Sequence, residues 1–175
     1  MPPPDLYVNT KVRQLIHIKK YIFVGDNQYL CIMIREILFG RPTLTLTTPT
    51  TSLDRATVRD IVKIATKWCV ANFGVNNRRH KPFKVSIRKQ VSGSPRYGEF
   101  DPIENTMVIF HNHCTTTKLL VQTVLHEYTH YMQPIRGSYF KLLKEHGYNN
   151  HPMEIEARES EKQYSECWKY IKTNI

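Results

Sequence analysis

The segment VLHEYTHYMQP, residues 124–134, places two histidines and a glutamate within five residues of a stretch that is otherwise suited to burial. The apolar residues before it favour a helix over residues 115–133, with a threonine N-cap and Pro134 just past its end. Helical spacing puts His126 and His130 one turn apart on the same face, where both imidazoles can point at one ion. A buried helix has no general use for such side chains, so the segment predicts a metal site.

Glu127 lies one position round the helix from His126. From there it can reach a water held by the metal rather than the ion itself, which is the physical content of an HExxH pattern: two ligands and a general base. A zinc ion lowers the pKa of its bound water to about 7, and Glu127 would take the proton as the water attacks a polarised carbonyl. The alternative, a surface helix with two solvated histidines, is disfavoured by the apolar neighbours Leu119, Leu120, Val121, Val124 and Leu125.

A catalytic zinc site needs a third protein ligand and one open position. The side chains that could supply the ligand are His111, His113, His146, His151, Glu154 and Glu156. Glu154 and Glu156 differ by about 200° around a helix, so only one of them can face the ion. Glu154 would lie in the first turn after Pro152, where a carboxylate interacts favourably with the helix dipole. Ile155 separates the two glutamates and is expected to face the core.

The pair HEYTH (126–130) and EIEARESE (154–161) resembles the gluzincin metallopeptidases. In that family the third ligand is a glutamate on a later helix, commonly followed by Ala or Gly, and the matching position here is Glu156, before Ala157. The resemblance implies His126, His130 and Glu156 as ligands of one Zn²⁺ and Glu127 as the catalytic base. In size and element order, residues 53–172 are similar to the single-domain minigluzincins.

The same resemblance extends to residues around the site. Gluzincins often carry an acidic residue four positions after the ligand glutamate, where it orients a histidine. Ser160 occupies that position here, and we expect its neighbour Glu159 to take the role, with Glu161 on the other side. Tyr148 or His151 is expected to donate a hydrogen bond to the developing oxyanion, or else to cap the last helix.

The HNHC segment, residues 111–114, offers two histidines and a cysteine that could form a second metal site. It sits where a strand becomes the loop before the metal helix. We therefore expect His111 and His113 to be rim or turn residues of the cleft.

The predicted fold class is α+β, because helices and strands are segregated along the chain. It is expected to be zincin-like: a helix, a three-stranded and mostly antiparallel sheet, the HExxH helix, a loop, and a C-terminal glutamate helix. Ser52 and Gly74 would bound the first helix, and Pro152 would open the last. The expected ranges are helix 53–73, a meander of strands 83–91, 96–101 and 106–112, helix 115–133, a loop with one helical turn over 136–150, and helix 152–171. Residues 1–51 would form an N-terminal extension, and residues 52–175 the metallopeptidase-like domain.

The net charge of +10 is unevenly distributed. Residues 53–100 carry 11 basic and 3 acidic side chains, and NNRRHKPFK (76–84) is the densest basic segment. Such an excess can attract nucleic acid or an acidic partner, or it can form a solvated surface.

Cysteine usage and the terminus indicate the compartment. Cys31, Cys69, Cys114 and Cys167 include no CxxC pair, so we expect reduced, buried thiols. No apolar run approaches the ~18–20 residues of a membrane span, and the N-terminus lacks the order of a secretory signal. We expect a protein that is not secreted, contacts no membrane and lies in the cytoplasm, or in a virion or host cytoplasm if the source is a phage.

The function predicted from these features is a zinc-dependent metallopeptidase that binds a peptide or protein substrate as an added strand. One alternative is a catalytically inactive zinc-binding structural protein with a fourth ligand from His146 or His151, docked on nucleic acid through its basic half. Another is an active protease docked in the same way. The oligomeric state is not indicated.

Overall fold

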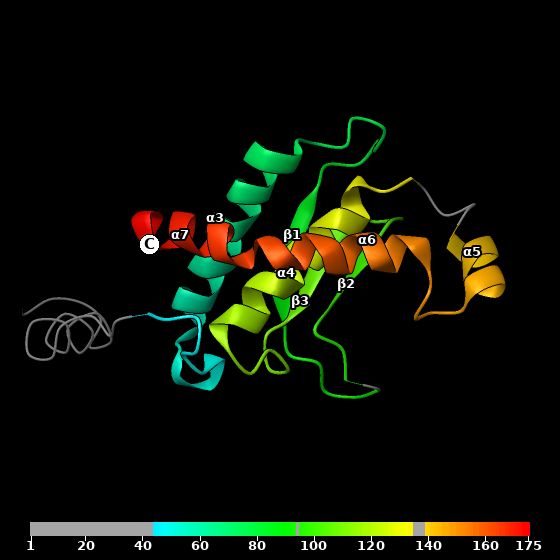
Figure 1. Ribbon diagram of the computed structural model, residues 1–175. Helices are drawn as coiled ribbons and strands as arrows, with labels where there is room; N and C mark the ends of the chain where they lie inside the picture. Colours follow the sequence, from blue (N-terminus) through cyan, green and yellow to red (C-terminus); the bar gives the residue numbers. More distant parts are fainter. Residues whose placement is uncertain (1–43, 94, 135–138) are drawn as a thin grey trace, which may run out of the picture. The chain divides into compact units, whose positions relative to one another are not determined.

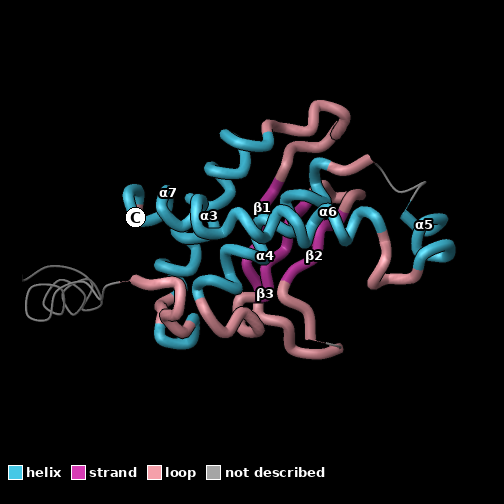
Figure 2. Tube along the Cα trace, viewed as in Figure 1, coloured by secondary structure: helices cyan, strands magenta, loops and turns pink. Residues whose placement is uncertain are grey.

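A computed structural model describes residues 44–93, 95–134 and 139–175. This part of the chain forms one compact unit, Leu44–Ile175. Residues 1–43 of the expected N-terminal extension lie outside the described residues. Figures 1 and 2 show the elements: η1 (Thr50–Ser52), α3 (Arg55–Phe73), β1 (Lys84–Arg88), β2 (Gly98–Asp101), β3 (Thr106–Phe110), α4 (Thr117–Met132), α5 (Tyr139–His146), α6 (Pro152–Ser160), η2 (Glu161–Gln163) and α7 (Tyr164–Asn174). The class is α+β, as predicted.

Helix α3 begins two residues later than its sequence suggested. Its N-cap is Asp54, whose carboxylate accepts a hydrogen bond from the Thr57 amide at 2.7 Å. Ser52, the expected cap, lies in η1 and donates to the carbonyl of Pro49 instead. A carboxylate at an N-cap also interacts favourably with the helix dipole, which explains the preference. Gly74 ends the helix with φ of 79°, a conformation that favours glycine.

The sheet has the order β1-β3-β2, so the expected antiparallel meander is wrong. Strand β2 pairs antiparallel with β3, but β1 pairs with the other edge of β3 in parallel, with Ser86 opposite Val108. β3 takes the centre because it is the most apolar strand, with four of its five residues buried. The segment between β1 and β2 is therefore a crossover at the end of the sheet rather than a hairpin turn. The tight turn lies between β2 and β3, at Asn105 with φ of 50°.

Helix α4 lies between the sheet and the C-terminal helices. It contacts β2 and β3 on one side and α6 on another, and Figure 1 shows α6 crossing in front of it. Thr116 caps its start by accepting from the Leu119 amide. Ten of its residues are buried, and the fully buried Leu120, Val124 and Leu125 belong to the main hydrophobic cluster. The helix that carries the HExxH pattern is thus part of the core, as its apolar sequence predicted.

The C-terminus of α4 is closed by the loop after α3. Asn76 donates from its side-chain amide to the carbonyls of Tyr131 and Met132, and its backbone amide donates to the Tyr131 hydroxyl. Arg79 donates to the carbonyls of Tyr131 and Gln133 at 3.3 and 3.1 Å, and its guanidinium stacks over the Phe100 ring. A cation beside the last carbonyls of a helix is stabilising. Part of the basic segment 76–84 therefore serves the fold.

The C-terminal region differs from the single helix that its sequence suggested. Pro152 opens α6 as predicted, but the 3-10 turn η2 separates α6 from α7. α6 packs on α4, whereas α7 packs on α3. The preceding loop contains α5, which has eight residues rather than the one turn expected.

Cys69, Cys114 and Cys167 are free and buried, as expected, and Cys31 lies outside the described residues. Within the part of the chain that the structure covers, no helix has the length and apolar character to cross a membrane.

Candidate metal centre

Three side chains from two helices converge at one point. The Nε2 atoms of His126 and His130, on α4, lie 3.1 Å apart. Glu154, on α6, places Oε2 3.5 Å from His126 Nε2 and Oε1 3.5 Å from His130 Nε2. The carboxylate is 5% exposed and the rings 18% and 16%. Two imidazoles and a carboxylate are ligands that suit zinc and other divalent transition metals.

The partners of the opposite ring nitrogens fix how the two rings face the centre. His126 Nδ1 lies 2.7 Å from Glu161 Oε1, and a carboxylate can only accept, so this nitrogen carries a proton. His130 Nδ1 lies 2.8 Å from Gln133 Oε1. The Gln133 amide nitrogen donates to the carbonyl of Met153 and to Glu156, which orients its oxygen toward His130. Both Nε2 atoms therefore remain for the centre, the arrangement of metal-ligating histidines.

The distances also fit a shared ion. Zinc–nitrogen bonds of about 2.0–2.1 Å at a tetrahedral angle separate two nitrogens by about 3.3 Å, close to the 3.1 Å observed. Three groups that all accept hydrogen bonds face one another, and such a set needs a cation or a proton among them. The residues present thus fit a divalent metal.

Electrostatics in the metal-free centre favour a cation. Burial opposes charge on Glu154, but the hydrogen bond from His126 and the charge of His130 lower the pKa of its carboxyl to about 2. Burial also disfavours the charged ring of His126, yet hydrogen bonds to Glu154 and Glu161 outweigh it and raise the pKa of His126 to about 9. Burial lowers the pKa of His130.

Glu127 lies beside the three ligands without belonging to them. It is 7% exposed, and burial raises the pKa of its carboxyl to about 8 against the opposing charge of His126. Its side chain packs on Gly98 of β2, where an added Cβ would lie 2.7 Å from Glu127 Cγ and 2.9 Å from the Thr123 methyl carbon. A glycine at this point of the strand gives the carboxylate its room. No signal in the sequence distinguished Gly98.

The third ligand predicted from the sequence, Glu156, is not part of the group. Its carboxylate accepts from Gln133, and its neighbour Ile155 is 50% exposed rather than in the core. The buried face of α6 instead carries Met153, Glu154 and Ala157. The gluzincin pattern favoured Glu156, but the face of α6 that packs on α4 decides between the two glutamates. Glu154, the alternative, takes the position.

The prediction that Glu159 orients a ligating histidine is also wrong. Glu159 is exposed and pairs with Lys162, and Glu161 is the carboxylate that contacts His126. Ser160 lies between them and accepts from Thr129, which ties α6 to α4. Glu161 begins η2, so its direction depends on the end of α6.

His151 does not face the centre as a hydrogen-bond donor. It is fully buried, its Nδ1 accepts from the Met153 amide, and its Nε2 donates to the carbonyl of Tyr139 at 3.0 Å. Both ring nitrogens are thus used by backbone groups, and the residue is the N-cap of α6. Of its two expected roles, capping is the one found.

Two tyrosines lie next to Glu154. The hydroxyl of Tyr139 donates to Glu154 Oε1 at 3.3 Å, and burial together with the Glu154 charge raises the pKa of Tyr139 to about 12. Tyr148 is 59% exposed, and burial of its hydroxyl and the nearby Glu154 carboxylate raise its pKa. Tyr148 was predicted near the site, and Tyr139 was not.

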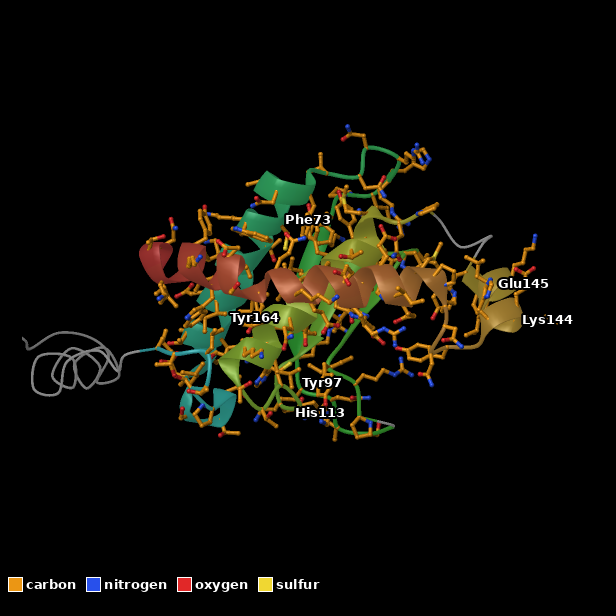
Figure 3. All side chains as sticks on the ribbon, viewed as in Figure 1. Phe73, Tyr97, His113, Lys144, Glu145 and Tyr164 are labelled. Carbon is orange, nitrogen blue, oxygen red and sulfur yellow. The ribbon has the colours of Figure 1, made fainter. Side chains whose placement is uncertain are left out.

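The HNHC histidines are not in the ligand group. Figure 3 shows His113 in the loop between β3 and α4, where its Nε2 lies 3.2 Å from the Asn112 amide nitrogen. Burial and the charges of Lys89 and Arg55 lower the pKa of His111.

A cleft of about 400 Å³ opens over the ligand group. Residues of β2 form one wall, both tyrosines and Phe140 form another, and Arg79 and Arg96 also line it. Glu127 and the three members of the ligand group are among the residues that line this cleft. Comparison of the chain with protein-family models, with curated proteins and with solved structures returned no match.

Proposed function

We propose that this protein is a zinc-dependent metallopeptidase of the gluzincin type, with His126, His130 and Glu154 as its metal ligands. The observation that carries the proposal is the pairing of a three-ligand group with a separate buried carboxylate, Glu127, at the floor of an open cleft. A catalytic zinc site needs this combination of three ligands, a base and access for substrate.

Zinc bound by these three residues would polarise a peptide carbonyl and lower the pKa of a bound water to about 7. Glu127 is then the general base, because it is close to the centre but is not needed as a ligand. It would take a proton from the attacking water and return it to the leaving amine. Glu161 and Gln133 hold the two imidazoles with Nε2 toward the centre throughout.

The tyrosines are the best candidates for donors to the oxyanion of the tetrahedral intermediate. Both line the cleft beside Glu154, and a phenol can donate a hydrogen bond where charge develops. Tyr148 is the more exposed and can turn toward substrate. Tyr139 already donates to Glu154 and supports that ligand.

Strand β2 is the expected docking edge for a peptide or protein substrate. It pairs with β3 on one side only, and Gly98, Glu99 and Phe100 line the cleft. A substrate added along this edge would gain main-chain hydrogen bonds with little dependence on its side chains.

The competing function is that of a structural protein with a closed zinc site. The positions of His151 and His146 argue against it. Such a site needs a fourth protein ligand. Among the described residues, the ligand group contains three members. His151 has both ring nitrogens on backbone groups, and His146 lies on α5 near Glu145.

The test is Glu127→Gln in the full chain, with zinc content and peptide hydrolysis both measured. We expect zinc at one equivalent and hydrolysis lower by at least about 100-fold, since a general base contributes that much or more. Glu159→Gln, on the exposed face of α6, is the matched control and should leave both unchanged. Retained zinc together with undiminished hydrolysis in Glu127→Gln would exclude this mechanism.

A further inference from the structure

A second hollow lies between α3 and the outer edge of β1, and basic side chains dominate it. It has a volume of about 510 Å³ and shares no lining residue with the metal cleft. Its cations are Arg55, Arg59, Lys63 and Lys67, and Val85, Ser86 and Ile87 of β1 form the opposite wall. We call this hollow the α3–β1 groove.

The four cations form a regular row. They recur at every fourth position of α3, so they lie on one face of the helix about 6 Å apart along its axis and span about 18 Å. All four are exposed. Like charges at this spacing destabilise a helix by a few tenths of a kcal/mol per pair. A solvated surface would gain nothing from this arrangement.

No acidic side chain neutralises the row among the residues that the structure describes. The ion pairs found there involve other lysines and arginines. Asp60, the only acidic residue within α3, does not line the groove, and Asp54 is engaged as the N-cap. Lys89, just after β1, adds to the positive charge near Arg55. The charges of both residues lower the pKa of the same histidine, His111.

We propose that the α3–β1 groove binds the sugar–phosphate backbone of a nucleic acid. A polymer with one negative charge per nucleotide can engage all four cations of a regular row, whereas an acidic peptide would need a matching run of carboxylates. Among the described residues, no aromatic side chain lines the groove, so the proposed binding does not rely on base stacking. Contacts of this kind position a nucleic acid without reading its sequence.

The sequence predicted that residues 53–100 could attract nucleic acid or an acidic partner, and this inference assigns the binding to one groove within that range. The densest basic segment, residues 76–84, is not the site, because Asn76 and Arg79 close α4 and Lys81 pairs with Glu104. The inference does not depend on the peptidase proposal, since the groove and the metal cleft are separate.

The experiment compares two charge-matched double variants of the full chain. Arg59→Gln with Lys63→Gln removes the middle of the row. Lys144→Gln with Lys172→Gln removes the same charge elsewhere; Figure 3 shows Lys144 projecting from α5. Binding of a fluorescent DNA duplex, and of single strands of DNA and RNA, is measured over a salt series. Circular dichroism and zinc content check that each variant is folded.

We expect the groove variant to bind at least about 10-fold more weakly at low salt. Its slope of log affinity against log salt should be shallower by about two, one for each lost phosphate contact. The control should keep the slope of the unaltered chain. Equal losses in both variants, or no nucleic-acid binding at low salt, would overturn the inference. Displacement by polyglutamate as effective as by DNA would assign the groove to an acidic protein instead.

Discussion

Gly98 on β2 and Glu127 on α4 are in direct contact. Because Gly98 has no side chain, the Glu127 side chain can occupy the space beside the strand. A Cβ at residue 98 would approach Glu127 Cγ to 2.7 Å and Oε1 to 3.0 Å. Glu127, the base of the proposed reaction, is therefore positioned by strand β2 as well as by its own helix, α4.

Gly98→Ala should lower peptide hydrolysis more than it lowers zinc binding. The added methyl group must displace Glu127 or Thr123, and overpacking of this kind costs about 1–3 kcal/mol. Hydrolysis, zinc content and melting temperature measured on the same sample separate the effects. Full hydrolysis with unchanged melting temperature would mean that the contact is accommodated without moving the base.

Glu154→Gln should weaken zinc binding by at least about 100-fold, because it removes the only carboxylate ligand and its charge. Glu156→Gln, two residues away on the same helix, is the matched comparison and should weaken zinc binding far less, because Gln133 keeps its hydrogen bond to the carbonyl of Met153 and a glutamine at 156 can still accept from it. Competition with a chelating dye measures both. The reverse ranking would restore Glu156 as the ligand and contradict the packing of α6 described above.

Glu161→Gln should lower zinc affinity by about 10–100-fold, the usual effect of removing a residue that orients a ligating histidine. Glu159→Gln should not, since Glu159 pairs with Lys162 away from the centre. Isothermal titration gives both affinities. Indistinguishable affinities for the two variants would show that Glu161 does not orient His126.

Zinc uptake should release protons. In the metal-free protein the pKa of His126 is about 9, so at about pH 7.5 its ring is mostly charged, and a ligating ring must be neutral. The pKa of Glu127, about 8, adds a further share because a nearby cation favours the carboxylate. We expect between one and two protons per zinc, and an affinity that falls as pH decreases. Binding heats in buffers of different ionisation enthalpy provide the count; heats independent of buffer would contradict it.

Arg79→Gln should destabilise the fold by about 1–2 kcal/mol, because it removes charged donors from the last carbonyls of α4. Arg78→Gln is the control, since Arg78 is exposed and its side chain makes no hydrogen bond described for this part of the chain. Urea unfolding with zinc saturated in every sample gives the free energies. Equal stability of the two variants would mean that Asn76 alone closes the helix.

The sequence predicted the features that depend on local pattern. The helix spanning His126 and His130, the α+β class and Pro152 at the start of α6 were all predictable from spacing and caps. The parallel pairing of β1 with β3 was not predictable. The alternation of apolar and polar residues along a strand is the same whether its partner runs parallel or antiparallel.

The third ligand and the residues that orient the histidines depend on tertiary packing. Glu154 rather than Glu156 joins the two histidines because His151, Met153 and Ala157 set the buried face of α6. Glu161 belongs to a segment that only tertiary folding brings to His126, whereas Gln133 lies three residues after His130 at the end of the same helix. The prediction of Glu156 came from its match to the gluzincin pattern, with Ala157 after it, and that match selected the other glutamate.

The short turn η2 has a consequence for the evolution and engineering of this chain. Glu161 is its first residue, so the carboxylate that steadies His126 stands where the α-helical pitch changes. A one-residue insertion or deletion between Ala157 and Glu161 would rotate that carboxylate away from the imidazole without changing His126, His130 or Glu154. Apart from Glu161 itself, the joint between α6 and α7 should therefore tolerate substitution far better than any change in length.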